Sequence, residues 1–254
     1  MQISATIITF NEEAKIAEAI KSVAFADEIL VVDSESTDKT REIAEALGAK
    51  VIVQKWLGFA KQKQFAVENA AHDWILSLDA DEKISVELKN EILNLDPQAD
   101  AYKLPRLSFY LNQPIRHGGW YPNWQIRFFN RNKARWKDVL IHESVEVSGK
   151  IEKLKGDILH YSVEDMTHHH RMIGERYAPL AARQMFERGR KTTKLKIYTA
   201  GLTTFLQTYI LKAGFLDGFA GFCIARFAAH HAFLKHLLLW EMENSEKLKV
   251  KSEK

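Results

Sequence analysis

The sequence has 254 residues, of which 46% are hydrophobic and 27% charged, so the chain can bury the core of one large domain or of one domain with an appendage. Its single cysteine, Cys223, excludes an intramolecular disulfide and a cysteine-based zinc site, and it fits a reducing compartment. The first residues enter an apolar run without a basic segment, which predicts no signal peptide. No uncharged apolar stretch reaches about 18 residues, so no helix is expected to span a membrane.

The net charge of +3 conceals an asymmetry along the chain. Residues 183–254 contain 13 Lys and Arg against 6 Asp and Glu, a balance of +7, whereas residues 1–182 contain 23 against 27, a balance of −4. A basic C-terminal part indicates an anionic partner, such as a membrane surface, a phosphorylated lipid or a nucleic acid.

In chain order, the first part alternates strands and helices. The apolar, β-branched runs predict strands at Ile3–Thr9, Glu28–Asp33, 50–54 and Trp74–Asp79. Helices are expected after Asn11, from a cap at Ser36 or Thr37 to Leu47, and over 58–71. This βαβαβαβ order with short loops predicts a parallel sheet with right-handed crossovers.

Polar residues follow three of these strands, at 9–12, 33–36 and 79–81. In a parallel sheet these ends meet at one edge, where open α/β sheets bind their ligands. Asp79 and Asp81 are two residues apart in an extended segment, so both can point one way, as a Mg²⁺ or Mn²⁺ site requires. A solvated turn with two acids is the alternative. Neither a G-x-G-x-x-G nor a Walker loop is present, which argues against an NAD enzyme or a P-loop ATPase.

Residues 101–162 change character to short β runs separated by turns. Trp120, Trp124 and Trp136 lie there among several arginines. Aromatic rings and guanidinium groups in loops suit stacking on sugars and pairing with phosphate, although an ordinary β-rich core with surface arginines gives the same pattern.

Residues 163–254 are predicted to form a helical extension. The apolar stretches 197–211 and 215–239 have the pattern of amphipathic helices that lie on a membrane, and a helical oligomer interface is the alternative. The triplet His168–His169–His170 is expected at the surface, because adjacent helical residues point in different directions and cannot all bind one metal.

Three segments together carry a family resemblance. Residues 7–12 (IITFNE), 31–38 (VVDSESTD) and 78–82 (LDADE), in this order and spacing, resemble the inverting family-two glycosyltransferases of GT-A fold. Residues 118–122, 125–129, 135–136 and 141–143 are similar to the bacterial lipopolysaccharide-core β-1,4-glucosyltransferases that modify the inner-core heptose. The Q-x-x-R-W signature of processive synthases is missing, which favours the addition of a single sugar.

The resemblance implies a Rossmann-like, mostly parallel α/β fold and a set of site residues. It divides the chain into a nucleotide-sugar-binding half (1–100), an acceptor-side half of the same domain (101–162) and the C-terminal extension (163–254). The donor site would be formed by Thr9, Phe10, Asn11, Glu12, Asp33, Ser36, Lys63 and Asp79. Of these, Asp33 would accept from the uracil N–H and Lys63 would reach the diphosphate. Asp81 would bind Mg²⁺ or Mn²⁺, with His160 completing the shell unless it is an ordinary hydrogen-bonded core histidine.

An inverting transferase also needs a base for the acceptor hydroxyl. Glu143 is the expected base and Asp138 the reserve; a salt bridge would be the ordinary role of either side chain.

The expected function is transfer of a hexose, with glucose favoured, from a UDP-sugar to the inner-core heptose of lipopolysaccharide. The enzyme would sit peripherally on the cytoplasmic face of the inner membrane, on an anionic lipid surface, with no nucleic-acid partner. Homo-oligomers through the C-terminal helices are a further expectation. The alternatives are transfer to a polyprenyl phosphate or capsule precursor, and a catalytically silent nucleotide-sugar-binding scaffold.

Overall fold

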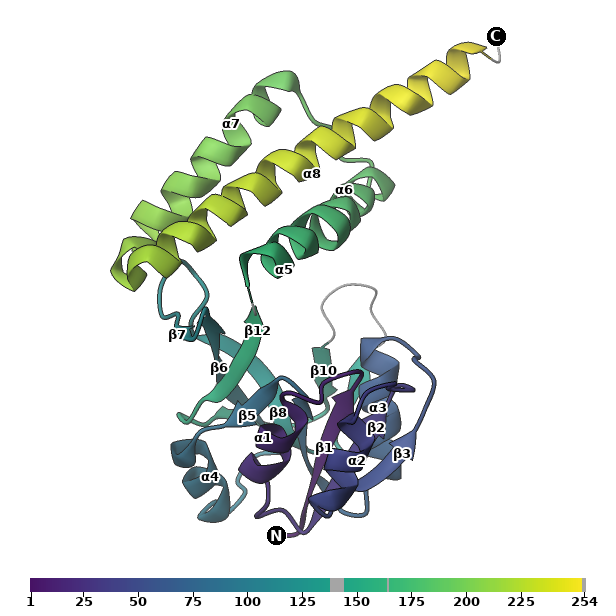
Figure 1. Cartoon of the computed structure of the whole chain (residues 1–254), viewed down its shortest axis with the longest axis vertical. Helices are drawn as coiled ribbons and strands as arrows, with labels where there is room; N and C mark the ends of the chain where they lie inside the picture. Colours follow the sequence, from purple (N-terminus) through teal and green to yellow (C-terminus); the bar gives the residue numbers. More distant parts are fainter. Residues whose placement is uncertain (138–143, 164, 253–254) are drawn as a thin grey trace. The chain divides into compact units, whose positions relative to one another are not determined.

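The computed structural model describes residues 1–137, 144–163 and 165–252 (Figure 1). These residues form two compact units. Unit 1 consists of Met1–Leu107 and Pro122–Tyr161, and unit 2 of Ser108–Tyr121 and Ser162–Lys254. The C-terminal helices are therefore joined in unit 2 by a short segment from the middle of the chain.

Unit 1 is built on a curled sheet with the strand order β3-β2-β1-β4-β8-β6-β12-β5. The expected parallel half is confirmed: it consists of β3 (Lys50–Val53), β2 (Glu28–Asp33), β1 (Ile3–Thr9) and β4 (Trp74–Asp79). The remaining strands on this path are β8 (Asn123–Asn130), β6 (Ala101–Tyr110), β12 (Ile158–Val163) and β5 (Glu82–Ile84). β8 pairs antiparallel with both β4 and β6.

Shorter strands complete the β structure. β7 (Gln113–Pro114) pairs antiparallel with β6, and β11 (Ile151–Lys153) pairs parallel with it. β9 (Ala134–Lys137) and β10 (Ser144–Val147) form a separate antiparallel pair.

Apolar side chains on the two faces of the sheet form two separate cores, because successive residues of a strand point to opposite faces. Ile3, Ala5 and Ile7 of β1 belong to a core with α1 (Ile16–Ser22), α2 (Thr40–Ala46) and α4 (Val86–Leu93). Ile8, on the other face, belongs to a core with α3 (Phe59–Asn69), β9 and β10. The parallel half is thus covered on both sides, and its strand ends remain at the edge.

The prediction that Ser36 or Thr37 caps the second helix is wrong. α2 begins at Thr40, whose backbone N–H donates to Asp38 Oδ1 at 3.0 Å. The Ser36 hydroxyl is used elsewhere: it accepts from the backbone N–H of Asn11 at 2.9 Å. Ser36 therefore belongs to the loops at the strand ends.

In unit 2 the helices are α5 (Met166–Arg171), a π-helical segment (Met172–Tyr177), α6 (Ala178–Glu187), α7 (Lys194–Phe205), a second π-helical segment (Leu206–Leu211), a 3₁₀ turn (Gly214–Asp217) and α8 (Gly218–Ser252). α8 packs against both α6 and α7 (Figure 1). Among the residues that the structure describes, no helix is long and apolar enough to cross a membrane.

The expectation that all three histidines of the triplet lie at the surface is wrong for His169, which is buried. Its Nδ1 lies 2.9 Å from the Tyr110 hydroxyl, and its ring lies 4.1 Å from that of Phe227. α5 thus turns one of three adjacent histidines inward. Burial, together with the neighbouring His168, lowers the pKa of His169 to about 4.

We therefore predict that acidification destabilises unit 2. The pKa of His169 is lower in the folded chain than its ordinary value, so the unfolded chain takes up the proton first. The stability that neutral His169 contributes is complete above about pH 6.5 and is lost as the pH falls towards 4. The urea midpoint should fall between about pH 7 and pH 5, and His169→Gln should show a smaller fall than the chain itself. The assignment would be contradicted if the urea midpoint of His169→Gln fell with pH as steeply as that of the unmodified chain. It would also be contradicted if His170→Gln, at an exposed position, reduced the fall by the same amount.

Candidate functional site

The three polar clusters expected from the sequence meet at the carboxyl ends of β1, β2 and β4. Thr9 is paired in register with Asp33 of β2, and Ile8 with Asp79 of β4. β1 lies between these two strands, so the chain order reverses direction across the sheet at this point. Open α/β sheets bind ligands at such a switch point.

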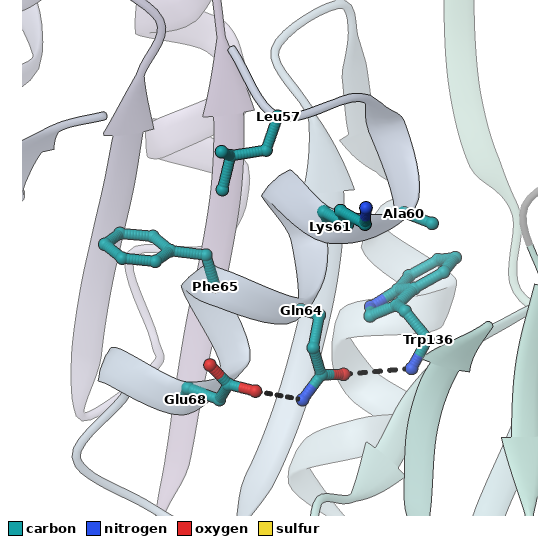
Figure 2. A pocket seen from close by; sticks show the side chains of 7 residues that line it. All are labelled: Leu57, Ala60, Lys61, Gln64, Phe65, Glu68 and Trp136. Atoms are coloured by element: carbon teal, nitrogen blue, oxygen red, sulfur yellow. Dashed lines mark hydrogen bonds between the residues drawn. The ribbon is translucent and has the colours of Figure 1, made fainter. Parts of the chain in front are cut away.

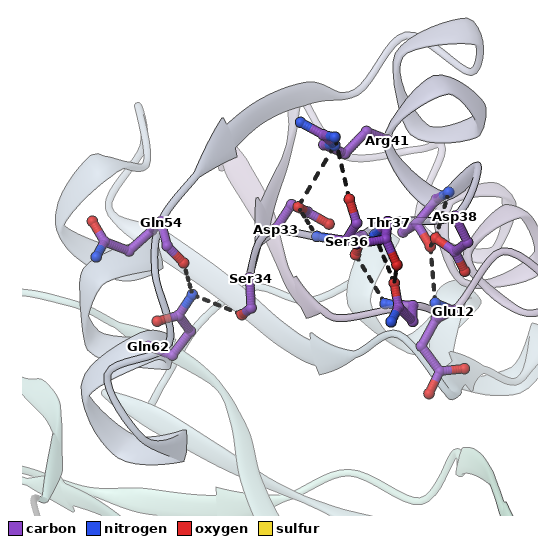
Figure 3. Close-up of polar contacts among 11 residues, drawn as sticks. Glu12, Asp33, Ser34, Ser36, Thr37, Asp38, Arg41, Gln54 and Gln62 are labelled. Atoms are coloured by element: carbon purple, nitrogen blue, oxygen red, sulfur yellow. Dashed lines mark hydrogen bonds and ion pairs between the residues drawn. The ribbon is translucent and has the colours of Figure 1, made fainter.

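Asp33 presents an unsatisfied acceptor at this edge. Its side chain is fully buried, and Oδ2 accepts from the backbone N–H of Ser36 at 2.8 Å, with Arg41 Nε at 3.8 Å (Figure 3). Oδ1 is also buried and has no hydrogen-bond partner within the described part of the chain. A buried carboxylate oxygen without a donor is costly, so this atom is a strong candidate to accept an N–H from a ligand.

The two loops that follow β1 and β2 are tied to each other (Figure 3). Asn11 donates its backbone N–H to Ser36 Oγ at 2.9 Å, and its Oδ1 accepts from the backbone N–H of Thr37 at 2.8 Å. Glu12 donates its backbone N–H to Thr40 Oγ1 at 2.8 Å. Asn11 and Ser36 thus shape the loops, whereas the ring of Phe10 is 55% exposed and can stack on a planar ligand.

Gln62 anchors the adjoining part of this edge. Its amide nitrogen donates to Ser34 Oγ and to the carbonyl of Gln54, both at 3.1 Å (Figure 3). The side chain is fully buried, so α3 is fixed against the segment that follows β2.

Asp79 lies in a cluster of charges with little access to water. Its Oδ1 lies 2.9 Å from Lys63 Nζ, and its Oδ2 accepts from Arg127 at 3.0 Å. Lys63 is fully buried, and the Arg127 side chain is 3% exposed. Burial opposes ionisation of Asp79, but the charges and hydrogen bonds of Lys63 and Arg127 outweigh it and hold the pKa of Asp79 well below its usual range. Asp79 is therefore a carboxylate at any physiological pH.

Glu82 is the second acid of this cluster. It is fully buried, pairs with Arg106 at 3.2 Å and Arg127 at 3.4 Å, and accepts from the backbone N–H of Asp79 at 3.0 Å. The indole of Trp136 lies 4.9 Å from Lys63 Nζ and 5.5 Å from the Arg127 guanidinium, measured to a ring centroid. The cluster thus holds three cations and two carboxylates.

Sequence reasoning assigned no role to Glu82, Arg106 or Arg127 individually. The run Ile126–Arg127–Phe128–Phe129 contained a usable signal, because an arginine inside an apolar strand needs a buried partner of opposite charge.

Asp81 and His160 come together beside this cluster. His160 Nε2 lies 3.3 Å from Asp81 Oδ2, and the two side chains are 15% and 22% exposed. The backbone N–H of Tyr161 donates to the Asp81 carbonyl at 3.0 Å, which fixes β12 next to the turn after β4. A carboxylate oxygen and an imidazole nitrogen suit Mn²⁺, and Mg²⁺ also accepts the carboxylate. Among the described residues no group of three His, Cys, Asp or Glu is placed to hold a metal, so further ligands would come from a bound phosphate and water.

The expected base, Glu143, and its reserve, Asp138, lie outside the described residues. Both assignments stay predictions. The strands that flank this segment, β9 and β10, pair with each other and belong to unit 1.

A hollow of about 300 Å³ lies on the outer side of α3 (Figure 2). It is lined by Leu57, Ala60, Lys61, Gln64, Phe65, Glu68 and Trp136. Of these, only Trp136 was expected near a bound sugar. Gln64 accepts from the backbone N–H of Trp136 and donates to Glu68, both at 3.0 Å. The hollow therefore shares Trp136 with the charge cluster but contains none of the strand-end carboxylates.

Comparison with known proteins identifies the class. Residues 4–173 match the model of glycosyl transferase family 2, so the chain belongs to this family and is a glycosyltransferase. Its α/β sheet has the GT-A-like architecture expected from the sequence.

Two curated relatives cover nearly the whole chain. An uncharacterized glycosyltransferase of Rickettsia typhi is 35% identical over 259 residues, 95% of this chain and 87% of the relative. The lipopolysaccharide core biosynthesis glycosyltransferase LpsC of Rhizobium meliloti is 27% identical over 245 residues, 92% of this chain and 90% of the relative. Among solved structures, S. aureus TarS 1–349 in complex with UDP-GlcNAc aligns at a TM-score of 0.49 with 18% identity, over 98% of this chain and 92% of that one.

We predict that Glu82→Gln destabilises unit 1 by about 3 kcal/mol, because removing one partner of a buried ion pair leaves Arg106 and Arg127 undercompensated. Urea unfolding of the two proteins measures the difference. Glu42→Gln, at an exposed position of α2, serves as the matched control and should unfold like the unmodified chain. A Glu82→Gln midpoint equal to that of the control would show that the cluster contributes nothing to stability.

Proposed function

We propose that the chain transfers a hexose, with glucose favoured, from a UDP-sugar to the inner-core heptose of lipopolysaccharide, with inversion at the anomeric carbon. The acceptor is borne on a lipid, and the reaction takes place at the cytoplasmic face of the inner membrane. The buried, unsatisfied Oδ1 of Asp33 carries the nucleotide assignment. The acceptor assignment is supported by the similarity to LpsC over 92% of the chain.

Uracil fits the strand-end edge by its hydrogen-bonding pattern. Its ring N–H is a donor, and Asp33 Oδ1 is a buried acceptor that needs one. Phe10 supplies an exposed ring for stacking on the base, and the buried Thr9 hydroxyl, which also has no partner in the described residues, gives a second polar atom at this edge. Because Asn11 and Ser36 hold the two loops together, the base would meet loops that are already held in position.

The diphosphate would lie beside Asp79 and Asp81. Lys63, Arg106 and Arg127 would offset the repulsion between the phosphates and the carboxylates of this region. Lys63 pairs with Asp79 in this structure, and its expected direct contact with the diphosphate stays a prediction.

Asp81 and His160 have the donor atoms to hold a divalent cation together with phosphate oxygens. When bound, Mg²⁺ or Mn²⁺ would neutralise the negative charge that develops on the departing nucleotide.

Inversion by direct displacement requires a base on the acceptor side, opposite UDP. Glu143 remains our choice and Asp138 the reserve. Either carboxylate would remove the proton from the attacking hydroxyl.

We predict UDP release that depends on Mg²⁺ or Mn²⁺, on one UDP-hexose and on a heptose-containing core oligosaccharide. The experiment is a panel of UDP-sugars, each assayed with and without acceptor and with and without a chelator. Activity with a purified prenyl phosphate but none with core oligosaccharide would replace the acceptor assignment. Binding of a UDP-sugar without transfer to any acceptor would indicate a silent scaffold.

We also predict that Asp33→Asn weakens UDP binding by at least about tenfold, measured by calorimetry. The remaining carboxamide oxygen would keep the bond from the Ser36 N–H, which turns the NH₂ towards the ligand, where it opposes the uracil N–H. Glu42→Gln, an exposed change on α2 outside the strand-end loops, is the control and should bind UDP normally. Unchanged affinity in Asp33→Asn would remove Asp33 from the nucleotide site.

A further inference from the structure

Unit 2 exposes several large apolar side chains on α7 and on the segment that leads into α8. On α7, Leu195, Tyr198 and Leu202 are 71%, 77% and 63% exposed, and their spacing of three and four residues places them on one side of the helix. Ile197 and Ala200, on the other side, are buried. A helix that packs by one side normally turns polar residues outward, so this outer side of α7 lacks the expected polarity.

The segment from α7 to α8 exposes further apolar side chains. Leu211, Leu216 and Phe219 are 80%, 60% and 71% exposed. Aromatic rings contact one another in this segment, with Tyr209 and Phe222 at 5.9 Å and Phe219 and Phe222 at 6.4 Å between ring centroids. We call Leu195, Tyr198, Leu202, Leu211, Leu216 and Phe219 the apolar face. Clustered apolar exposure of this kind marks an interaction surface.

The charges around the apolar face are mostly positive. Residues 188–240 contain eight Lys and Arg but a single acid, Asp217. One further acid, Glu243 of α8, lies at the start of α7, where it accepts from the backbone N–H of Thr192 at 2.8 Å. Asp217 is 5% exposed and accepts from the backbone N–H of His117 at 2.8 Å, so it contributes little to the surface. Lys194 and Lys196 flank Leu195 in the sequence, Lys212 follows Leu211, and all three lysines are exposed.

We propose that the apolar face of unit 2 docks on an anionic lipid bilayer. Its leucine and aromatic side chains enter the boundary between headgroups and acyl chains, and the surrounding Lys and Arg pair with lipid phosphates. No described helix is suited to crossing the bilayer, and shallow docking does not require one.

A second copy of the chain is a poorer occupant of this face. A two-fold contact would bring eight cations of each copy together with few acidic partners, and like charges oppose such an interface. An anionic bilayer supplies the missing charge. The inference deepens the proposed function by naming how the enzyme meets a lipid-borne acceptor, but it rests on unit 2 alone.

The experiment measures cosedimentation of the full chain with vesicles of phosphatidylcholine, with or without phosphatidylglycerol. The variant combining Tyr198→Ser, Leu202→Ser, Leu211→Ser and Phe219→Ser should lower partitioning onto the anionic vesicles by about tenfold or more. These side chains are exposed, so circular dichroism should show an unchanged fold. A second variant, combining Lys194→Gln, Lys196→Gln and Lys212→Gln, should lose the preference for anionic lipid.

A matched control changes exposed apolar residues elsewhere. Val86→Ser with Leu93→Ser, at positions of α4 that are 69% and 54% exposed, should leave vesicle binding intact. Binding by the fourfold variant equal to that of the control would overturn the proposal. The proposal would also be overturned if the unmodified chain formed a dimer in ultracentrifugation, the fourfold variant were a monomer, and neither protein bound vesicles. Transfer to a soluble acceptor should be equal in all these variants, so failure of the docking proposal and failure of the proposed function can be told apart.

Discussion

Asp79, whose side chain is 23% exposed, stays ionised because Lys63 and Arg127 contact its carboxylate. The same arginine reaches Glu82, which in turn accepts from the backbone N–H of Asp79. These residues come from α3, β4, β5 and β8, so one set of ion pairs joins the parallel half of the sheet to its antiparallel half. A protein with apolar residues of equal volume in these positions can be as stable as one with such ion pairs. The ion pairs therefore specify one arrangement of the strands as much as they add stability.

That arrangement places two different surfaces side by side in unit 1. One is the edge at β1 and β2, where Asp33 offers a buried acceptor and Phe10 an exposed ring. The other is the turn after β4, where Asp81 meets His160. In the proposed function, the base would lie at the first surface and the phosphates at the second. Recognition of the base would then be separate from the handling of charge, and both would depend on the position of β1 between β2 and β4.

Much of unit 1 follows from local sequence. Alternating apolar runs and helical spacings predict the parallel strands, and the rule that ligands bind at strand ends then groups Thr9, Asp33 and Asp79. Local sequence does not predict the partners of Asp79, because Lys63 and Arg127 approach it through tertiary packing from positions 16 and 48 residues away. The helix cap predicted at Ser36 is wrong because the Ser36 hydroxyl accepts from the backbone N–H of Asn11, 25 positions earlier. His169 was missed because only the packed position of α5 shows which of three adjacent histidines turns inward.

Asn11 and Glu35 both adopt left-handed backbone conformations, with φ of 51° and 64°. Asn tolerates this region better than Glu, and such positions persist only where surrounding contacts enforce them. Here the contacts between the two loops are hydrogen bonds made by the chain's own atoms, so folding itself restricts the conformational freedom of these loops. The nucleotide end of a donor would thus meet a rigid template. Discrimination among nucleotides would depend on the fit of the base to fixed atoms, with little room for the loops to adapt to a different one.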